Sequence, residues 1–170
     1  MLCEEVARAA AQGTMWDNTT RFFELDGKPL HHLSLVSSFC EYTVVPHNGA
    51  IRIPQDTPSE QACLLGCGAM AGIGAAVNTA QLRPGDSIAV FGCGGVGHSL
   101  IQGAKLCNSL PIIAVDIRAE KEAEALRFGA THFVNASSTD PVAAIRAITA
   151  GGADYTFEVT GNVEQAELCY

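Results

Sequence analysis

The stretch from Ser87 to Asp116 constrains the fold of this chain more than any other part of it. A short apolar run at 87–91 is followed by the glycine pattern G-x-G-x-x-G at 92–97 and then by residues that a helix accepts, up to Leu106. A short apolar run between turn signals is typical of a strand buried on both faces of a parallel sheet. The order of strand, glycine turn and helix predicts a βαβ unit that binds a dinucleotide.

The glycines of this pattern have separate steric roles. Gly92 permits the tight turn, Gly94 lets the backbone approach a pyrophosphate, and Gly97 lets the helix pack closely on the sheet. The free N–H groups and the positive dipole end at the start of the helix attract phosphate. A second apolar run, 112–115, ends in Asp116, where a carboxylate is placed to accept both ribose hydroxyls of an adenosine. We therefore favour a dinucleotide site over a turn of purely structural importance.

A methyltransferase is the main alternative, since it also places a glycine loop and a ribose-binding acid on such a unit. Methyltransferases typically carry an acidic residue just before the first glycine. This chain has Val90 and Phe91 there, which argues against that alternative.

Composition limits the class of protein. The 170 residues are 48% hydrophobic and 16% charged with a net charge of −8, which indicates a soluble, globular, acidic protein and argues against nucleic acid as a partner. No run approaches the roughly 18 apolar residues of a membrane span, and no secretory signal is seen, so we expect a cytoplasmic protein without a membrane partner. Seven cysteines without a C-x-x-C pair favour reduced thiols over a disulfide framework.

The half of the chain before the glycine pattern is expected to be irregular and β-rich. Residues 1–12 are compatible with a short helix, and residues 38–46 and 50–53 have a β-rich composition on either side of an Asn-Gly turn. A helix is predicted to start at 57–60, to be interrupted by Gly66, and to resume from Ala69 to Ala80.

The alternation of helix and strand continues after Asp116. We predict a helix at 119–128, a strand at 131–135, a helix at 141–150 and a strand at 155–159. A doubly wound dinucleotide sheet has the strand order 3-2-1-4-5-6, and this chain supplies candidates for strands one to four. The fourth strand would be an open edge, so we expect poor solubility.

Cys67 is the candidate metal ligand. It lies between two glycines, where its sulfur is free to turn toward an adjacent cleft and ligate zinc, although composition alone favours a buried free cysteine. His31 and His32 are adjacent and point apart on either a strand or a helix, so we interpret them as structural or surface residues.

The chain resembles a known family along essentially its whole length. The segments that carry the resemblance are GTMWDNTTRF (13–22), GKPLHHL (27–33), SSFCEYTVV (37–45), LLGCGAMAGIGAAVNTA (64–80), AVFGCGGVG (89–97), IIAVDI (112–117), FGATHFVNA (128–136) and GGADYTFEVTGN (151–162). Together they are similar to the zinc-dependent medium-chain alcohol dehydrogenases, and most of all to the class III, thiol-dependent formaldehyde dehydrogenase type.

The resemblance implies an α/β fold in three parts. Residues 1–66 would be the C-terminal part of a β-rich, GroES-like catalytic domain, and 67–80 a connecting helix. Residues 81–170 would be a truncated NAD-binding Rossmann domain, a partial doubly wound sheet with strands one to four.

The resemblance also implies two cofactors, NAD and Zn²⁺. Cys67 matches the third protein ligand of the catalytic zinc, which reverses the preference from composition, and Cys3 matches the last of four cysteines that hold a structural zinc. No catalytic residue is assigned. The positions implied to bind NAD are Gly92, Gly94, Gly95 and Gly97 at the pyrophosphate, Val96 near the nicotinamide, Asp116 on the ribose with a preference for NAD over NADP, and Lys121, which reaches the adenosine ribose.

The chain departs from the family pattern in ways that lead us to expect an internal fragment of a longer enzyme. The other zinc ligands would lie before Met1 and strands five and six beyond Tyr170, and Ala71 stands where many members carry threonine or serine. We expect no turnover from this chain alone. The parent is expected to transfer a hydride from a primary alcohol or an S-hydroxymethyl thiol adduct to NAD, as a homodimer or homotetramer. The alternatives are a non-catalytic NAD-binding remnant and a zinc-free quinone reductase-like member of the same superfamily, against which Cys67 speaks.

Overall fold

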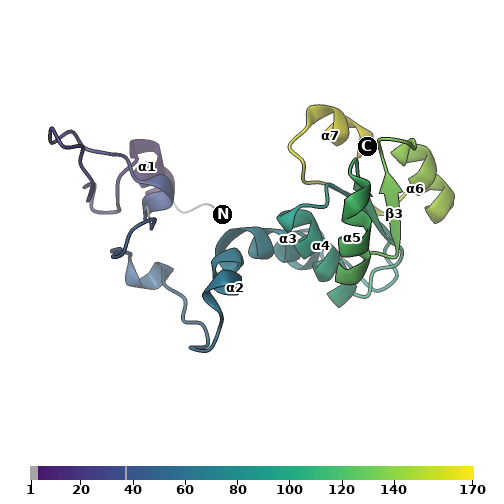
Figure 1. Cartoon of the computed structure of the whole chain (residues 1–170), viewed down its shortest axis with the longest axis horizontal. Coiled ribbons are helices and arrows are strands. Elements are labelled where there is room, and N and C mark those ends of the chain that lie inside the picture. The colour runs from purple at the N-terminus through teal and green to yellow at the C-terminus, as the bar shows by residue number, and fades with distance from the viewer. Residues whose placement is uncertain (1–3, 37) are drawn as a thin grey trace. The chain divides into compact units, whose positions relative to one another are not determined.

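The computed structural model describes residues 4–36 and 38–170, and the chain forms two compact units, residues 1–56 and 57–170 (Figure 1). The predicted domain boundaries at 66 and 80 remain predictions.

The first unit is largely irregular. Its helix α1 spans Glu4–Gln12, in agreement with the predicted short helix, and two single turns, η1 and η2, span Leu33–Leu35 and His47–Gly49. The unit has a small buried centre that includes Ala9, Met15 and His32. Nε2 of His32 accepts a hydrogen bond from the backbone N–H of Arg21 over 3.0 Å, so this histidine is a structural residue.

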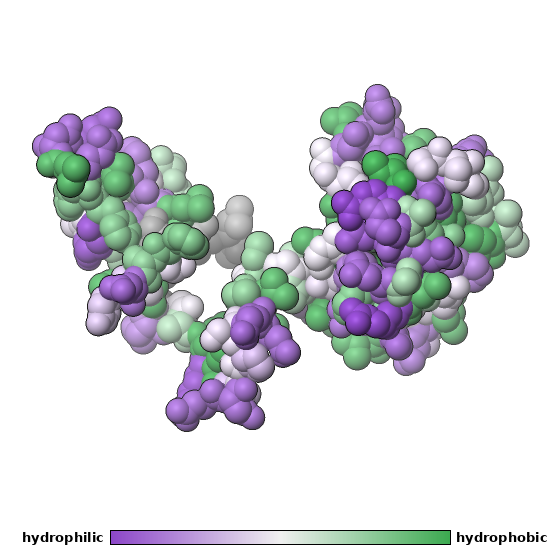
Figure 2. Space-filling model, in the orientation of Figure 1, coloured by the Kyte–Doolittle hydropathy of each residue, from purple (hydrophilic) through white to green (hydrophobic). Residues whose placement is uncertain are grey.

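The strands predicted at 38–46 and 50–53 are not formed. The described part of this unit contains only an isolated antiparallel bridge between Phe23 and Pro29. A strand needs a hydrogen-bonded neighbour, and the described residues offer these segments none. Phe39, Tyr42 and Ile51 are consequently exposed, and hydrophobic residues colour much of the visible surface of this unit in Figure 2.

The second unit begins with a helical stretch that runs through the predicted interruption. The segments α2 (Ser59–Leu64), η3 (Leu65–Ala69), α3 (Met70–Gly74) and η4 (Ala75–Thr79) follow one another without a break. Gly66 does not end the helix. The backbone widens into a π-helical turn at η3 instead, a feature that is rare and often found at functional sites.

The expectation that no segment approaches the length and apolar composition of a membrane span is wrong for this stretch. Among the described residues, 59–79 is one helical stretch long and apolar enough to cross a membrane by length and composition, a test that the core helix of a soluble protein also passes. One face of the stretch packs on another helix, because a Cβ at the buried Gly72 would overlap the backbone oxygen of Val96. Leu64 and Met70 are exposed.

The rest of the second unit is a parallel four-stranded sheet in the order β3-β2-β1-β4. Its elements are β1 (Ile88–Phe91), α4 (Gly95–Leu106), β2 (Ile112–Asp116), η5 (Ala119–Lys121), α5 (Glu122–Phe128), β3 (His132–Asn135), α6 (Pro141–Thr149), β4 (Tyr155–Glu158) and α7 (Val163–Leu168). The predicted α/β fold with strands one to four of a doubly wound sheet is confirmed, and the predicted element bounds differ by a residue or so.

Two hydrophobic layers cover the two faces of the sheet. Ile88 and Val90 of β1 point into one layer together with Leu100 of α4, whereas Ala89 points into the other layer with Ile145 of α6. All four residues of β1 are buried. Because β1 is central and fully covered, the turn that follows it emerges at a fixed place on the carboxyl edge of the sheet.

Candidate functional site: a dinucleotide pocket at the carboxyl edge of the sheet

The glycine turn joins β1 to α4 with almost no free space on its inner side. Gly92 has a φ of +104°, a conformation that glycine adopts without the strain of a side chain. A Cβ at Gly97 would overlap the carbonyl oxygen of Gly92. The first and last glycines of the pattern are therefore required for the close contact between turn and helix, as the sequence predicts.

The outer side of the same turn is open. Among the described residues, a Cβ at Gly94 or Gly95 would meet no atom within 4 Å, and no side chain caps the N-terminus of α4. The backbone N–H groups and the positive end of the helix dipole therefore face open space, which is the arrangement that binds phosphate. The turn fits a dinucleotide pyrophosphate.

Asp116 lies at the end of β2 beside this turn. Its Oδ2 accepts a hydrogen bond from the backbone N–H of Cys93 over 2.8 Å, and its Oδ1 accepts one from Arg118 N over 2.9 Å. Each carboxylate oxygen accepts two hydrogen bonds, so both oxygens of Asp116 keep one acceptor position for a ligand. The carboxylate is held in place and still competent to accept ribose hydroxyls.

Lys121 follows Asp116 on η5, and its side chain is only partly exposed. Its Nζ lies 3.3 Å from Oε2 of Glu124, so the ammonium is paired within the chain. The role predicted for Lys121 at the adenosine ribose stays a prediction.

Cys93 and His98 are buried beside the site. Burial raises the pKa of the Cys93 thiol to about 12, so this cysteine stays protonated and unreactive at neutral pH. Burial lowers the pKa of His98, because it disfavours the charged imidazolium. The His98 ring packs on Phe128 with 4.8 Å between ring centroids, and its Nε2 has no hydrogen-bond partner among the described residues. Both side chains are structural groups under the turn.

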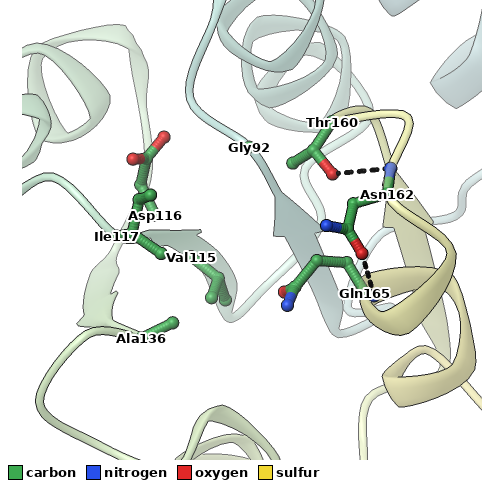
Figure 3. Close-up of a pocket in the computed structure, with 8 residues that line it drawn as sticks. All are labelled: Gly92, Val115, Asp116, Ile117, Ala136, Thr160, Asn162 and Gln165. Atoms are coloured by element: carbon green, nitrogen blue, oxygen red, sulfur yellow. Dashed lines mark hydrogen bonds between the residues drawn. The ribbon is translucent and has the colours of Figure 1, made fainter.

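A pocket of about 290 Å³ opens between the ends of the strands (Figure 3). One of its walls comes from the ends of β2 and β3, and the opposite wall comes from the loop after β4 and from α7. The lining residues are Gly92, Val115, Asp116, Ile117, Ala136, Thr160, Asn162 and Gln165.

Glu158 fixes the loop that forms the second wall. Its carboxylate accepts hydrogen bonds from the backbone N–H of Thr160 at 2.5 Å, from the Thr160 hydroxyl, and from the N–H of Gly161 at 3.1 Å. Burial acts to raise the pKa of Glu158, but these hydrogen bonds outweigh it and hold the pKa below its ordinary value. A Cβ at Gly92 would lie 2.8 Å from the Thr160 methyl carbon, so the loop packs directly against the turn.

The residues of this second wall were missed by the sequence analysis, which ends its elements at the fourth strand. Asn162 is the N-cap of α7, and its Oδ1 accepts hydrogen bonds from the backbone N–H groups of Glu164 at 2.8 Å and Gln165 at 3.3 Å. An asparagine with a glutamine three residues later is the signature of a capping box. That pattern is present in the sequence and would have predicted α7.

Of the two predicted metal ligands, Cys67 is the one among the described residues. Cys67 is exposed on the π-helical turn η3, and a Cβ at the next residue, Gly68, would lie 4.0 Å from a methyl carbon of Val96 at the glycine turn. The structure thus brings the Cys67 turn close to Val96. Residues 4–36 and 38–170 contain no group of three or more His, Cys, Asp or Glu placed to hold a metal ion. Cys3 lies outside the described residues.

The comparisons with known proteins agree on one family. A family model described as zinc-binding dehydrogenase matches residues 95–170. The chain is 45% identical over 168 residues to S-(hydroxymethyl)glutathione dehydrogenase of Saccharomyces cerevisiae, covering 96% of this chain and 44% of that protein. It is 43% identical to alcohol dehydrogenase class-3 of Cereibacter sphaeroides, covering 96% of this chain and 46% of that protein. The chain therefore spans about half the length of the curated relatives it matches.

Two solved structures also resemble this chain over about half of their own length or less. An alcohol dehydrogenase zinc-binding domain protein from Burkholderia ambifaria has a TM-score of 0.85 and 38% identity, covering 98% of this chain and 48% of that one. Benzyl alcohol dehydrogenase from Acinetobacter calcoaceticus has a TM-score of 0.79 and 36% identity, covering 85% of this chain and 41% of that one.

Proposed function

We propose that this chain is part of a zinc-dependent medium-chain alcohol dehydrogenase, in which it binds NAD and contributes this site to the transfer of a hydride from an alcohol to NAD. The observation that supports this most directly is the carboxylate of Asp116, fixed by Cys93 N–H beside an open glycine turn. A turn that served only to connect β1 and α4 would have no need of an acid held with free acceptor positions.

The glycines of the turn have different roles in binding the dinucleotide. The N-terminus of α4, with Gly94 and Gly95 at its start, accepts the pyrophosphate, and Gly92 and Gly97 hold that helix against the sheet. Val96 lies next to the Cys67 turn and is proposed to face the nicotinamide. NAD, once bound, supplies the hydride-accepting ring, and this chain orients it and limits the approach of water.

Asp116 is proposed to set the choice between the two nicotinamide dinucleotides. Its carboxylate accepts the ribose hydroxyls of NAD, whereas the 2′-phosphate of NADP would bring like charges together. The nearby Lys121 is paired with Glu124, which limits the compensation that it offers.

Zinc is the second proposed cofactor, with Cys67 as a ligand of the catalytic ion and Cys3 as a ligand of a structural one. The described residues alone do not form a closed metal site. Cys67 within the GCG block favours the zinc-dependent enzyme over a zinc-free quinone reductase-like one.

The names of the relatives suggest the class of substrate. The yeast relative acts on S-(hydroxymethyl)glutathione and the Acinetobacter relative on benzyl alcohol, so we propose a primary alcohol or an S-hydroxymethyl thiol adduct. We further propose a cytoplasmic homodimer or homotetramer for the whole enzyme.

Titration calorimetry of the full 170-residue chain tests the cofactor assignment. We expect saturable binding of NAD, and binding of NADP at least about tenfold weaker, because a misplaced phosphate beside Asp116 costs more than about 1.4 kcal/mol. A folded chain that binds neither dinucleotide, or that prefers NADP, contradicts the proposal. Circular dichroism of the same sample establishes that the chain is folded.

A further inference from the structure

The pocket beside Asp116 has two chemically different walls. The wall formed by the ends of β2 and β3 is apolar and includes Val115, Ile117 and Ala136, whereas the wall formed by the β4–α7 loop and α7 carries amide side chains (Figure 3). A flat ring that lies against the apolar wall would have its edge turned toward the amides.

Asn162 has only part of its amide available to a ligand. Its Oδ1 is engaged as the N-cap of α7, so the remaining free group is the Nδ2 donor. The cap also fixes the start of α7, and the Glu158 clamp fixes the loop before it. Gln165 therefore projects from a first helical turn that is held at both its cap and its loop.

The side chain of Gln165 does not form the hydrogen bond that is usual in a capping box. In a capping box the glutamine at this position accepts a hydrogen bond from the backbone N–H of the N-cap residue. Here the N–H of Asn162 donates to the hydroxyl of Thr160 instead, over 3.2 Å. The side-chain amide of Gln165 is half-buried, makes no hydrogen bond with the described residues, and points into the pocket (Figure 3).

A primary amide that the described residues leave unpaired in a half-apolar pocket matches the edge of a purine. The amide offers one acceptor and two donors, and glutamine pairs in two contacts with the exocyclic amine and a ring nitrogen of adenine. The base is joined directly to the ribose, so a ribose held by Asp116 places its base within this pocket.

We propose that the side-chain amide of Gln165 hydrogen-bonds the amine-bearing edge of the adenine of NAD and selects for that base. This inference rests on the proposed function, because it requires that the ribose be held at Asp116. It adds a base-reading residue on α7 to the phosphate-binding turn and the ribose-binding acid.

The test compares NAD with its 1,N⁶-ethenoadenine analogue, in which an added ring removes the N⁶–H donor and blocks N1. Binding of both dinucleotides is measured by titration calorimetry on the full chain, on Gln165→Leu, and on Gln61→Leu as a matched control on the exposed face of α2. We expect the unchanged chain and the control to bind the analogue about tenfold more weakly than NAD. One hydrogen bond to the base is lost, and the amide of Gln165 is left unpaired.

In Gln165→Leu we expect NAD to bind about as weakly as the analogue, so that the ratio of the two dissociation constants falls to near one. A steric effect of the added ring would persist in both proteins and leave the ratio unchanged, which would overturn the inference. Equal binding of the two dinucleotides by the unchanged chain would overturn it too, while leaving the proposed NAD site intact. A folded chain that binds neither compound overturns both.

Discussion

The backbone N–H of Cys93 donates a hydrogen bond to Oδ2 of Asp116 over 2.8 Å, and so ties the second position of the glycine turn to the end of the neighbouring strand. This bond couples the two halves of the proposed cofactor site, because the segment that approaches the phosphates also orients the ribose acceptor. A change at Asp116 can therefore be chosen to keep this bond and remove the charge.

Asp116→Asn is that change. The amide oxygen still accepts from the N–H of Cys93, so the turn should stay tied to β2. The exposed bond from Arg118 N–H and the anionic acceptor for the ribose hydroxyls are lost. Since a hydrogen bond to a charged group contributes about 1.5–3 kcal/mol, NAD should bind about 10- to 100-fold more weakly. Calorimetry measures the loss. Asp140→Asn is the matched control, because asparagine caps α6 as aspartate does. Undiminished NAD affinity in Asp116→Asn would refute the ribose assignment.

Gly97→Ala and Gly95→Ala test the steric logic of the turn as a pair. A methyl group at Gly97 overlaps the Gly92 carbonyl oxygen and should cost about 1–3 kcal/mol of unfolding free energy. A methyl group at Gly95 meets no atom within 4 Å and lies at the first helical position, so stability should be unchanged or rise by up to about 1 kcal/mol. Urea unfolding measures both variants. Equal midpoints for the two would show that the turn is not closely packed.

The sequence was sufficient to predict the sheet and half of the proposed site. The run from Ser87 to Asp116 encodes strand, turn, helix and acid locally, and the structure has these elements where they were expected. The β4–α7 wall was missed because its polar residues, Asn162 and Gln165, follow the last predicted strand and carry no hydrophobic periodicity. At 38–46 and 50–53 the β-rich composition wrongly predicted strands. Such a composition forms strands only where partner strands are present.

Gly66 shows a third kind of failure. Its low helix propensity predicted a break, but the flanking segments are strongly apolar and α3 packs closely on α4 through Gly72. Tertiary packing overrides the propensity, and the backbone accommodates the glycines by widening into a π-turn. The role of Cys67 on that turn remains a prediction.

His98 should make the stability of the chain fall under mildly acidic conditions. Its ring is buried against Phe128 with Nε2 unpaired among the described residues, and burial lowers its pKa in the folded state despite the nearby carboxylates of Glu124 and Asp116. Below about pH 6.5 the unfolded chain binds a proton at this histidine, whereas the folded chain does not. Unfolding is therefore increasingly favoured as the pH falls from about 6.5 toward the lowered pKa of folded His98.

His98→Phe separates this effect from other titrations. Phenylalanine keeps an aromatic ring against Phe128 and removes the proton site, so the fall in urea midpoint between about pH 7 and pH 5 should become shallower in the variant. The carboxylates of Asp154 and Glu158 have lowered pKa values, so the stability that they contribute is lost only at more acidic pH. The matched control is His132→Phe, which makes the same substitution at an exposed position. A His98→Phe slope equal to that of the unchanged chain would mean that His98 gains its proton in the folded state as readily as in the unfolded one, and that the ring is accessible to water.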